Sequence, residues 1–542
     1  MRSLRVISME VDIIQKTLGG YGCYQMLVYT LLGLMYMRGA WHTFNIIFLG
    51  AVPAHTCTVA NRTVDNSLQI VAGECDVALM VSNATHTVNE TDACSAWQYD
   101  SMHRASSIVS EWDLVCNKNY LVELSTTIYM IGSASGAVIL TPFSDRFGRK
   151  RLLLSCLCIQ AVIGFAVAFV QNYVAFTLLR AVVGFLNMGI ALSAYVMMTE
   201  VFPASHRTLP SIAMQIFWAV GVMLLSLFAY LVRDWRHLEM LVSLPNVLAI
   251  VYIWCLPESL PWLLSQKKIR KAKAVIRWAV KLNKLPSNMV ELLEPSSSPT
   301  GLSGQAEAGG QGKASDPLNT QENSVTSASN SKTLPGILDL VKTPRIRLYA
   351  ILMWYLFFVN SLSYFGLSFS TPNLHGNPYL NLCLMGAVEI PAYAICMLVI
   401  NWLGRRVPVC VFLLICGVTN IAAIFVPADC EELSYLKLTI LMIGKFGITG
   451  SYSTIYLLAA EIFPTSVRNQ AVGIASFFEN IGSISAPLIV YVAKKIPELP
   501  FVVFGVLTII GAGVVLLLPE TRHRPLPETI EEIEGWHRKP TS

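Results

Sequence analysis

The chain alternates between long apolar runs and shorter polar connections. An apolar run of about 20 residues can cross a hydrocarbon core of about 30 Å as an α-helix. The pattern predicts roughly twelve membrane-spanning helices. The first six cover residues 23–50, 120–142, 152–171, 173–200, 209–232 and 237–256. The second six cover residues 346–370, 378–402, 407–427, 434–461, 466–493 and 499–518.

Composition agrees with an all-α membrane protein. The 542 residues are 54% hydrophobic and 13% charged, whereas a soluble domain is roughly 25% charged. The net charge of +5 comes from Lys and Arg dispersed among the connections. This dispersion argues against a nucleic-acid-binding surface, since such a surface concentrates its basic residues.

Three short motifs recur in the same order in the two groups of helices. The pairs are Asp145–Lys150 with Asn401–Arg406, Glu200–Pro203 with Glu461–Pro464, and Pro257–Ser259 with Pro519–Thr521. The offsets between partners lie between 256 and 262 positions, which indicates a duplicated unit. Two parallel membrane repeats are typical of a transporter whose halves rock about a central site.

The basic connections predict orientation, because Lys and Arg are enriched in cytoplasmic loops. They fall on one side of the predicted bundle, so both termini should be cytoplasmic. The expected divisions are an N-terminus (1–22), a first six-helix bundle (23–256), a cytoplasmic connection (257–344), a second bundle (345–518) and a tail (519–542).

The cytoplasmic connection has two parts. Residues 257–290 read as amphipathic helix, which can lie on the membrane surface or against the bundle ends. Residues 295–334 are rich in Ser, Gly, Ala, Gln and Asn, and they predict a disordered linker.

The long loop at residues 53–118 falls on the outer side. Its three Asn-x-Ser/Thr triplets predict glycan acceptors at Asn61, Asn83 and Asn89. Its four cysteines are Cys57, Cys75, Cys94 and Cys116. In an oxidising compartment they predict two disulfides with three possible connectivities. A zinc site is the less favoured alternative, because no two of these cysteines lie close in sequence.

At these motifs the chain resembles a known family. Ser144–Lys150 is similar to the loop signature of the major facilitator superfamily. Further segments resemble its organic ion transporters, solute carrier family 22; they are Ser107–Cys116, Asp234–Arg236, Pro257–Leu264, Val388–Pro391, Ala460–Asn469 and Leu518–Thr521. The resemblance implies the major facilitator fold, with twelve helices in two pseudo-symmetric bundles, and a carrier without a cofactor or metal.

The resemblance also implies that the repeated motifs form a charge network at an inward gate. The candidates are Asp145, Arg146, Arg149, Glu200, Arg207, Arg405, Glu461 and Arg468. Arg149 is expected to reach carboxylates of the neighbouring half, while static surface pairing is the alternative reading. The second copy has Asn401 where the first has Asp145, so the two halves need not be held with equal strength.

Charged residues inside apolar helices are costly, and each is a candidate site. They are Arg38, Arg180, Glu389, Lys445 and Glu479. Glu389 is a candidate cation partner, or it forms a buried pair with Lys445. Arg180 and Lys445 can form pairs that change during transport or fixed structural pairs. Arg38 can snorkel, pair with a carboxylate, or recognise a substrate carboxylate.

The resemblance places the substrate among aromatic residues. Positions matching the cavity of cation members are Tyr195, Trp218, Phe357 and Tyr364, and Gln215 is a polar neighbour. Glu389, Glu479 and Asn480 complete the candidate set, although Glu479 need not face the cavity and can face the helix at 434–461 instead. Aromatic faces attract alkylammonium groups by about 0.5–2 kcal/mol each. By this resemblance, organic cation members carry Asp at the position matching Asn480, while anion and carnitine-type members carry Arg, and this chain has neither. Neutral Asn480 therefore suits a zwitterion or a weakly charged amine at least as well as a simple cation.

Together these features predict a plasma-membrane carrier of small organic cations or zwitterions, such as amines, carnitine-like betaines or amino-acid conjugates, with a possible co-transported ion. An organic-anion exchanger of the same family is the alternative, and a non-transporting receptor is a third reading. The sequence has no Gly-x-x-x-x-Gly-Lys loop, His-Glu-x-x-His motif or Gly-x-Ser-x-Gly motif, so an enzyme or ATP-driven pump is not expected.

Overall fold

The computed structural model describes residues 12–58, 68–72, 75–81, 91–93, 96–99, 106–286, 339–371, 374, 376–427, 431–464, 467–522, 524 and 527–535. The expected glycan acceptors Asn61, Asn83 and Asn89 lie outside the described residues, as do Cys94, the side chain of Cys57 and the linker 295–334.

The helices of the first half follow the apolar runs. They are α2 (Cys23–Phe44) with α3 (Ile46–Leu49), α5 (Tyr120–Phe147), α6 (Arg149–Val167), α7 (Tyr173–Val201), α8 (Thr208–Leu231), and the series α9 (Trp235–Ser243), η4 (Leu244–Leu248) and α10 (Ala249–Cys255). Polar caps fix several beginnings. Asn172 accepts a hydrogen bond from the Val174 N–H at the start of α7, and Asp234 caps α9.

The second half repeats this order. Its helices are α15 (Pro344–Phe369), α16 (Pro378–Leu403), α17 (Arg406–Ile424), α18 (Glu431–Ile462), α19 (Arg468–Val492) and α20 (Leu499–Val515). The short helices α14 (Asp339–Lys342) and α21 (Ile530–Gly535) flank it. Each predicted span corresponds to a helix or helix series with ends within a few residues.

Nine helices among the described residues are long and apolar enough to cross a membrane. Of the remaining candidates, α20 is also apolar but shorter, at 17 residues. The helices α2 and α18 have membrane length but carry buried polar side chains, including Arg38 and Lys445.

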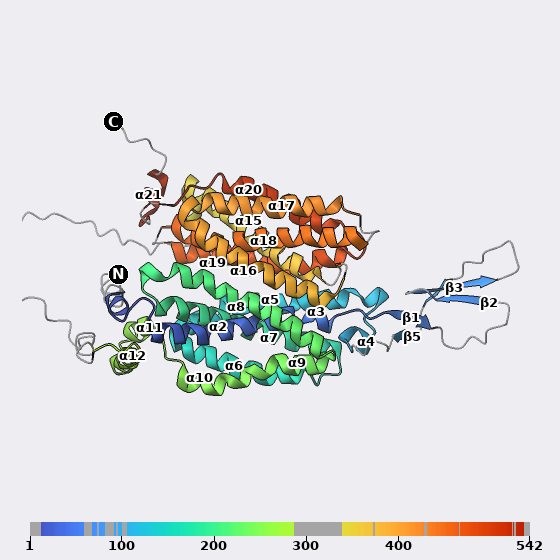
Figure 1. Ribbon diagram of the computed structural model, residues 1–542, viewed down its shortest axis with the longest axis horizontal. Helices are drawn as coiled ribbons and strands as arrows, with labels where there is room; N and C mark the ends of the chain where they lie inside the picture. Colours follow the sequence, from blue (N-terminus) through green and yellow to red (C-terminus); the bar gives the residue numbers. More distant parts are fainter. Residues whose placement is uncertain are drawn as a thin grey trace, which may run out of the picture.

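The two halves form two helical layers that lie side by side (Figure 1). Within the first half, α5 packs along α7. Within the second half, α15 packs along α19. Between the halves, α8 packs against α16 and α5 against α19. We call the end at which α2 ends and α5 begins the loop end, and the opposite end, where α5 meets α6, the motif end.

Close helix packing depends on glycine at one crossing in the first half. A Cβ at Gly132 of α5 would lie 2.1 Å from the carbonyl oxygen of Ala181 in α7. Small residues allow such backbone approach in membrane bundles, where apolar burial alone gives little drive for helix association. The α5–α7 crossing therefore requires the missing side chain.

The loop end carries a small region outside the helices. Strands β1 (His55–Thr58) and β5 (Ala96–Tyr99) pair antiparallel, and β2 (Leu68–Ala72), β3 (Asp76–Val81) and β4 (Thr91–Ala93) form an antiparallel sheet in that order. Helix α4 (Ile108–Trp112) and η2 (Cys116–Lys118) lead into α5.

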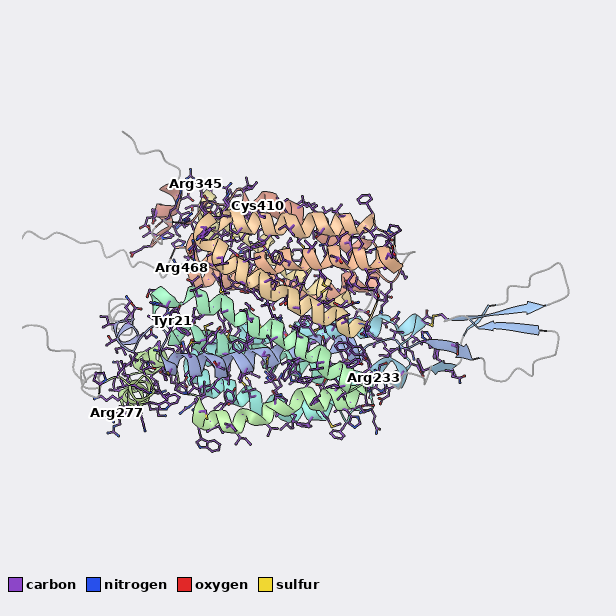
Figure 2. The ribbon with its side chains drawn as sticks, in the orientation of Figure 1. Tyr21, Arg233, Arg277, Arg345, Cys410 and Arg468 are labelled. Atoms are coloured by element: carbon purple, nitrogen blue, oxygen red, sulfur yellow. A yellow bond between two sulfur atoms is a disulfide. The ribbon has the colours of Figure 1, made fainter. Side chains whose placement is uncertain are left out.

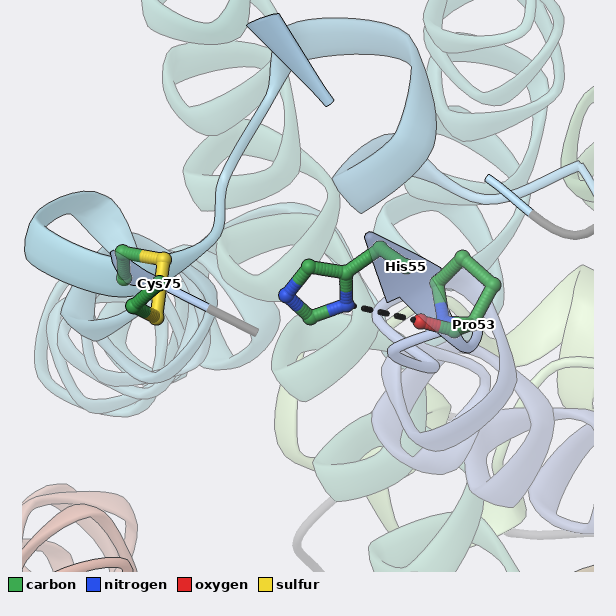
Figure 3. The surroundings of a disulfide bond; sticks show 4 residues. Pro53, His55 and Cys75 are labelled. Atoms are coloured by element: carbon green, nitrogen blue, oxygen red, sulfur yellow. Dashed lines mark hydrogen bonds between the residues drawn. A yellow bond between two sulfur atoms is a disulfide. The ribbon is translucent and has the colours of Figure 1, made fainter. Parts of the chain in front are cut away.

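A disulfide joins Cys75 to Cys116 in this region (Figure 3). The His55 imidazole lies close to the two sulfur atoms, and its Nδ1 is 3.1 Å from the Pro53 carbonyl oxygen. Because the sulfur atoms are bonded to each other, they are not the thiolates that a zinc site needs.

The amphipathic segment after α10 packs against the motif end of the first half. It forms α11 (Leu260–Ser265) and α12 (Ile269–Leu282). Ala272, Ile276 and Ala279 of α12 are buried in the same apolar cluster as Tyr24 of α2. One face of the amphipathic segment therefore packs against the end of the first bundle. Arg277, Arg345 and Arg468 all lie at this end, while Arg233 lies at the other (Figure 2).

Candidate functional site

A buried ion pair lies in the core of the second half. Lys445 Nζ of α18 is 3.0 Å from a carboxylate oxygen of Glu389 in α16, and both side chains are about 2% exposed or less. The ammonium also donates to Ser368 Oγ at 2.7 Å. Tyr393 donates its hydroxyl to Glu389 at 3.2 Å. Because both charges are paired and hydrogen bonded, their burial is compensated.

Aromatic side chains connect this pair to the first half. The Lys445 ammonium lies 3.3 Å from the centre of the Tyr364 ring. Trp218 of α8 donates its Nε1–H to the Tyr364 hydroxyl at 2.9 Å. The Trp218 ring lies 5.6 Å from the Tyr36 ring, and Tyr36 donates its hydroxyl to Gln215 at 3.1 Å. This chain of contacts spans the boundary between the two halves.

A second carboxylate, Glu479, is linked to Tyr364 through Tyr452. Both oxygens of Glu479 in α19 accept hydrogen bonds, one from the Tyr452 hydroxyl and one from the Tyr456 hydroxyl of α18. The Tyr452 ring is 5.4 Å from the Tyr364 ring, and the Tyr456 ring is 4.8 Å from the Phe357 ring. Glu479 is therefore an oriented carboxylate within a set of aromatic faces.

We call this set the central cluster; its members are Tyr36, Gln215, Trp218, Phe357, Tyr364, Glu389, Lys445, Tyr452, Tyr456 and Glu479. It unites most of the predicted substrate residues. Two predicted members behave differently. Asn480 donates its amide to the Ser476 carbonyl of its own helix at 2.7 Å. Tyr195 of α7 is partly buried and packs against an apolar cluster of the first half.

Three members of the cluster were not predicted from the sequence. Tyr452 and Tyr456 lie seven and eleven residues after Lys445, which places all three on one helical face. Counting helical positions from the intramembrane lysine would have indicated both. Tyr36 lies two residues before Arg38, and no sequence feature distinguishes it from the other aromatic residues of α2.

The intramembrane arginines lie in the core of the first half, apart from the central cluster. Arg38 is 1% exposed and donates to Gln160 Oε1 at 2.7 Å and Asn187 Oδ1 at 3.4 Å. It does not snorkel, because its side chain points inward to these amide partners. Arg180 donates to Asn45 Oδ1 at 2.8 Å and lies 5.0 Å from the centre of the Tyr129 ring.

A buried carboxylate in the middle of α9, Glu239, completes this polar core. Asn45 donates its amide to Glu239 at 2.6 Å and thereby links Glu239 to Arg180. His42 Nδ1 lies 3.9 Å from the other Glu239 oxygen. Glu239 was not predicted from the sequence, although a charge inside the apolar run 237–256 is the signal that identified the other intramembrane charges.

The gate motif of the first half folds into a network within that half. Arg149 lies 3.0 Å from Asp145 and 3.3 Å from Glu200. Ser259 donates its hydroxyl to Glu200, and Glu258 accepts the Lys150 backbone N–H at 3.0 Å. The expectation that Arg149 reaches the other half is therefore wrong for this state, because carboxylates of its own half are nearer.

The second half repeats this geometry. Arg405 lies 3.0 Å from Glu461, and Thr521 donates its hydroxyl to the same carboxylate. Arg207 and Arg468 also correspond, since each donates its Nε–H to a backbone carbonyl five residues earlier, at 2.8 and 3.1 Å. Asn401 instead donates to the Met397 carbonyl at 3.4 Å, so the Asp145–Arg149 pair has no equivalent in this copy.

Glycine is required at the same point of both motifs. Gly148 and Gly404 have φ values of +111° and +85°, which side chains rarely adopt. A Cβ on Gly148 would lie 2.6 Å from the Glu258 carboxylate, and a Cβ on Gly404 would lie 2.6 Å from the Glu520 carboxylate. The repeated Gly thus allows a glutamate to approach the start of the next helix, where its charge is favoured by the dipole.

Glu520 has the more extensive set of backbone donors. Burial alone would raise the pKa of this carboxyl group, but the N–H groups of Arg405, Arg522, Arg406 and Thr521 hold the pKa below its usual range. These four bonds are 2.9–3.0 Å long.

Arg146 does not join either network through the contacts that the structure gives. Its side chain is exposed and lies 5.6 Å from the centre of the Phe147 ring of the same helix. Arg146 lies near the end of α5, whereas Arg149 begins α6, and Gly148 turns the chain between them.

Comparison with known proteins identifies the architecture and its family. The model of the Major Facilitator Superfamily matches residues 119–487 and 382–540. The chain belongs to this superfamily. Within the superfamily, it is 33% identical to mouse solute carrier family 22 member 21 over 97% of this chain and 93% of that protein. It is 34% identical to mouse organic cation/carnitine transporter 2 over 97% of this chain and 94% of that protein.

These full-length matches place the chain in solute carrier family 22, a family of membrane transporters. Among solved structures, the inward-open xylose transporter XylE from E. coli aligns with a TM-score of 0.59. That alignment covers 94% of this chain and 98% of XylE at 15% identity, and it confirms the major facilitator fold.

Proposed function

We propose that the chain is a secondary transporter of small organic cations or zwitterions, and that the central cluster binds the positively charged group. The observation that carries this proposal is Glu479, whose two carboxylate oxygens are oriented by Tyr452 and Tyr456 among further aromatic rings. A carboxylate beside aromatic faces suits an alkylammonium group by charge and by cation–π attraction.

The charge balance of the cluster supports a cation over an anion. Glu389 is neutralised by Lys445 at 3.0 Å, while Glu479 accepts its hydrogen bonds from two neutral hydroxyl groups. The cluster therefore has one carboxylate in excess. Arg38 and Arg180, which an anion exchanger would use, bond instead to amide side chains in the first half.

Alternating access follows from the position of the cluster between the halves. Trp218 belongs to α8 of the first half and Tyr364 to α15 of the second, and one hydrogen bond joins them. Separation of the halves would break this bond and expose the rings to substrate. Similarity to organic cation/carnitine transporter 2 supports amines or carnitine-like betaines as the substrate class.

The proposal includes a plasma-membrane location, with the loop end outside and both termini in the cytoplasm. The basic helix α12 at the motif end supports this orientation by the enrichment of Lys and Arg in cytoplasmic loops. Because the membrane potential favours entry of positive charge, a cation would move inward without ATP. Transport, rather than catalysis of a covalent reaction, is the proposed activity.

Uptake into proteoliposomes tests the proposal. A panel of labelled amines, betaines and carboxylates, measured with and without a sodium gradient, gives the substrate class and any ion coupling. Glu479→Gln keeps the size of the side chain and removes its charge. We expect it to lower kcat/KM for a transported amine about tenfold or more, which corresponds to about 1.4 kcal/mol or more of lost binding.

Glu498→Gln provides the matched control, because Glu498 is an exposed carboxylate at the loop end. It should leave amine uptake unchanged. Transport of carboxylates alone would refute the charge preference, and equal amine uptake by wild type and Glu479→Gln would refute the role of Glu479.

A further inference from the structure

An ion pair joins the two halves at the loop end. Lys494 Nζ, just after α19 in the second half, lies 2.6 Å from Glu123 Oε1 in the first turn of α5. The same ammonium donates to Asn119 Oδ1 at 2.6 Å. The side chains of Glu123 and Lys494 are 14% and 24% exposed, so water screens this pair less than a surface pair.

The partly buried charge of the Glu123 carboxylate depends on Lys494 as its counter-ion. Its second oxygen, Oε2, is buried and has no hydrogen-bond partner among the residues that the structure describes. A partly buried carboxylate that loses its cation pays the cost of desolvation without the Coulombic gain. The pair is therefore more than two mobile surface charges that happen to meet.

Aromatic contacts surround this pair on the same side of the molecule. The rings of Tyr120 and Tyr491, each three residues from one member of the pair, lie 6.4 Å apart edge to face. Across the other part of the interface, Phe48 stacks on Tyr379 at 5.1 Å, and Tyr379 also meets Tyr230 at 5.8 Å. These contacts bring residues of both halves together at the loop end.

The ion pairs of the gate motifs differ in this respect. Arg149 pairs with Asp145 and Glu200 of its own half, and Arg405 pairs with Glu461 of its own half. Those pairs can persist when the halves rotate against each other. The Glu123–Lys494 pair cannot persist if the loop end opens, because its members belong to different halves.

We propose that Glu123 and Lys494 form a latch that holds the loop end closed and that must break each time this end opens. The latch rests on the proposed alternating-access function, and it makes the closed state more populated without contacting substrate. Its loss should shift the equilibrium toward opening at the loop end, since a ligand-free two-state protein responds to any interaction present in one state only.

Distances between spin labels measure this equilibrium directly. Leu231 at the end of α8 and Phe425 after α17 are 68% and 80% exposed, and they report on opposite halves at the loop end. Cysteines at these two positions, in full-length protein whose free cysteines are serine, carry the labels in nanodiscs without substrate. We expect Glu123→Gln and Lys494→Gln each to raise the population at the longer distance, relative to the population at the shorter distance, about fivefold.

The double variant Glu123→Lys/Lys494→Glu should return the distribution toward that of wild type, which a folding defect would not do. Lys495→Gln removes the same charge one residue away and should leave the distribution unchanged. The latch is refuted if neither single neutral variant shifts the distances, or if Lys495→Gln shifts them equally.

The distances between the spin labels, compared with uptake, also distinguish the latch from the proposed transport of cations or zwitterions. A shift in distance with no uptake of any panel substrate supports the latch and contradicts the substrate class. Robust amine uptake by wild type with unchanged distances in both neutral variants supports transport and contradicts the latch.

Discussion

Replacement of Lys445 by methionine tests the buried ion pair most directly. The substitution keeps the length of the side chain but removes the ammonium that lies 3.0 Å from Glu389. Glu389 would retain the Tyr393 hydroxyl at 3.2 Å as a partner, but its charge would be uncompensated at about 1% exposure. Breaking such a pair typically costs about 3–5 kcal/mol.

For a helical half of this size, a loss of that order lowers the melting temperature by roughly 10 °C. Thermal unfolding of the purified protein in nanodiscs, followed by tryptophan fluorescence, measures the shift. Lys445→Met/Glu389→Met removes both charges together and should recover most of the lost stability, because buried pairs are often replaceable by apolar side chains.

The double variant also provides the refutation. If Lys445→Met melts within about 2 °C of wild type, the carboxylate is not compensated by Lys445. If the double variant is no more stable than the single variant, the loss comes from packing around Ser368 and Tyr364 and not from an unpaired charge.

Two further outcomes follow from the packing and the motif geometry. Gly132→Ala should destabilise the protein by about 1–3 kcal/mol because its Cβ meets the Ala181 carbonyl, whereas Gly473→Ala, with nothing within 4 Å, should be neutral in the same melting assay. Glu520 has a lowered pKa, so its stabilising contribution is complete above the unfolded carboxyl pKa of about 4.3 and is lost as the pH falls through the folded value. The melting-temperature gap between wild type and Glu520→Gln should therefore be constant from pH 7 to pH 5 and shrink below about pH 4.3; a gap that grows on acidification would contradict the sign.

The helices were predictable because their determinants are local. Each requires an apolar run of membrane length, and polar caps or Gly and Pro mark the ends, as at Asn172 and Gly148. The duplication was also visible, since it is a property of sequence order. The repeated motifs fold into corresponding networks that include the paired Arg207 and Arg468 side chains, although the second copy lacks an equivalent of the Asp145–Arg149 pair.

Partners within the networks were less predictable. Arg149 was expected to cross between the halves, but it pairs with Asp145 near the end of α5 and with Glu200 at the end of α7. Arg146 belongs to the same motif and yet points to the Phe147 ring. A motif gives residue types and spacing, while the choice among competing carboxylates depends on the distances that helix packing sets.

The sequence by itself determined the membrane class, the helix order, the two halves and the intramembrane charges, because hydrophobic length and charge burial are properties of single segments. Only the tertiary structure decided which of these charges meet. Glu479 meets Tyr452 and Tyr456, and Lys494 meets Glu123 across the halves, because helix rotation and register bring distant residues to hydrogen-bonding distance. The rotation and register of each helix arise from the packing of all the helices together, and no single segment encodes them.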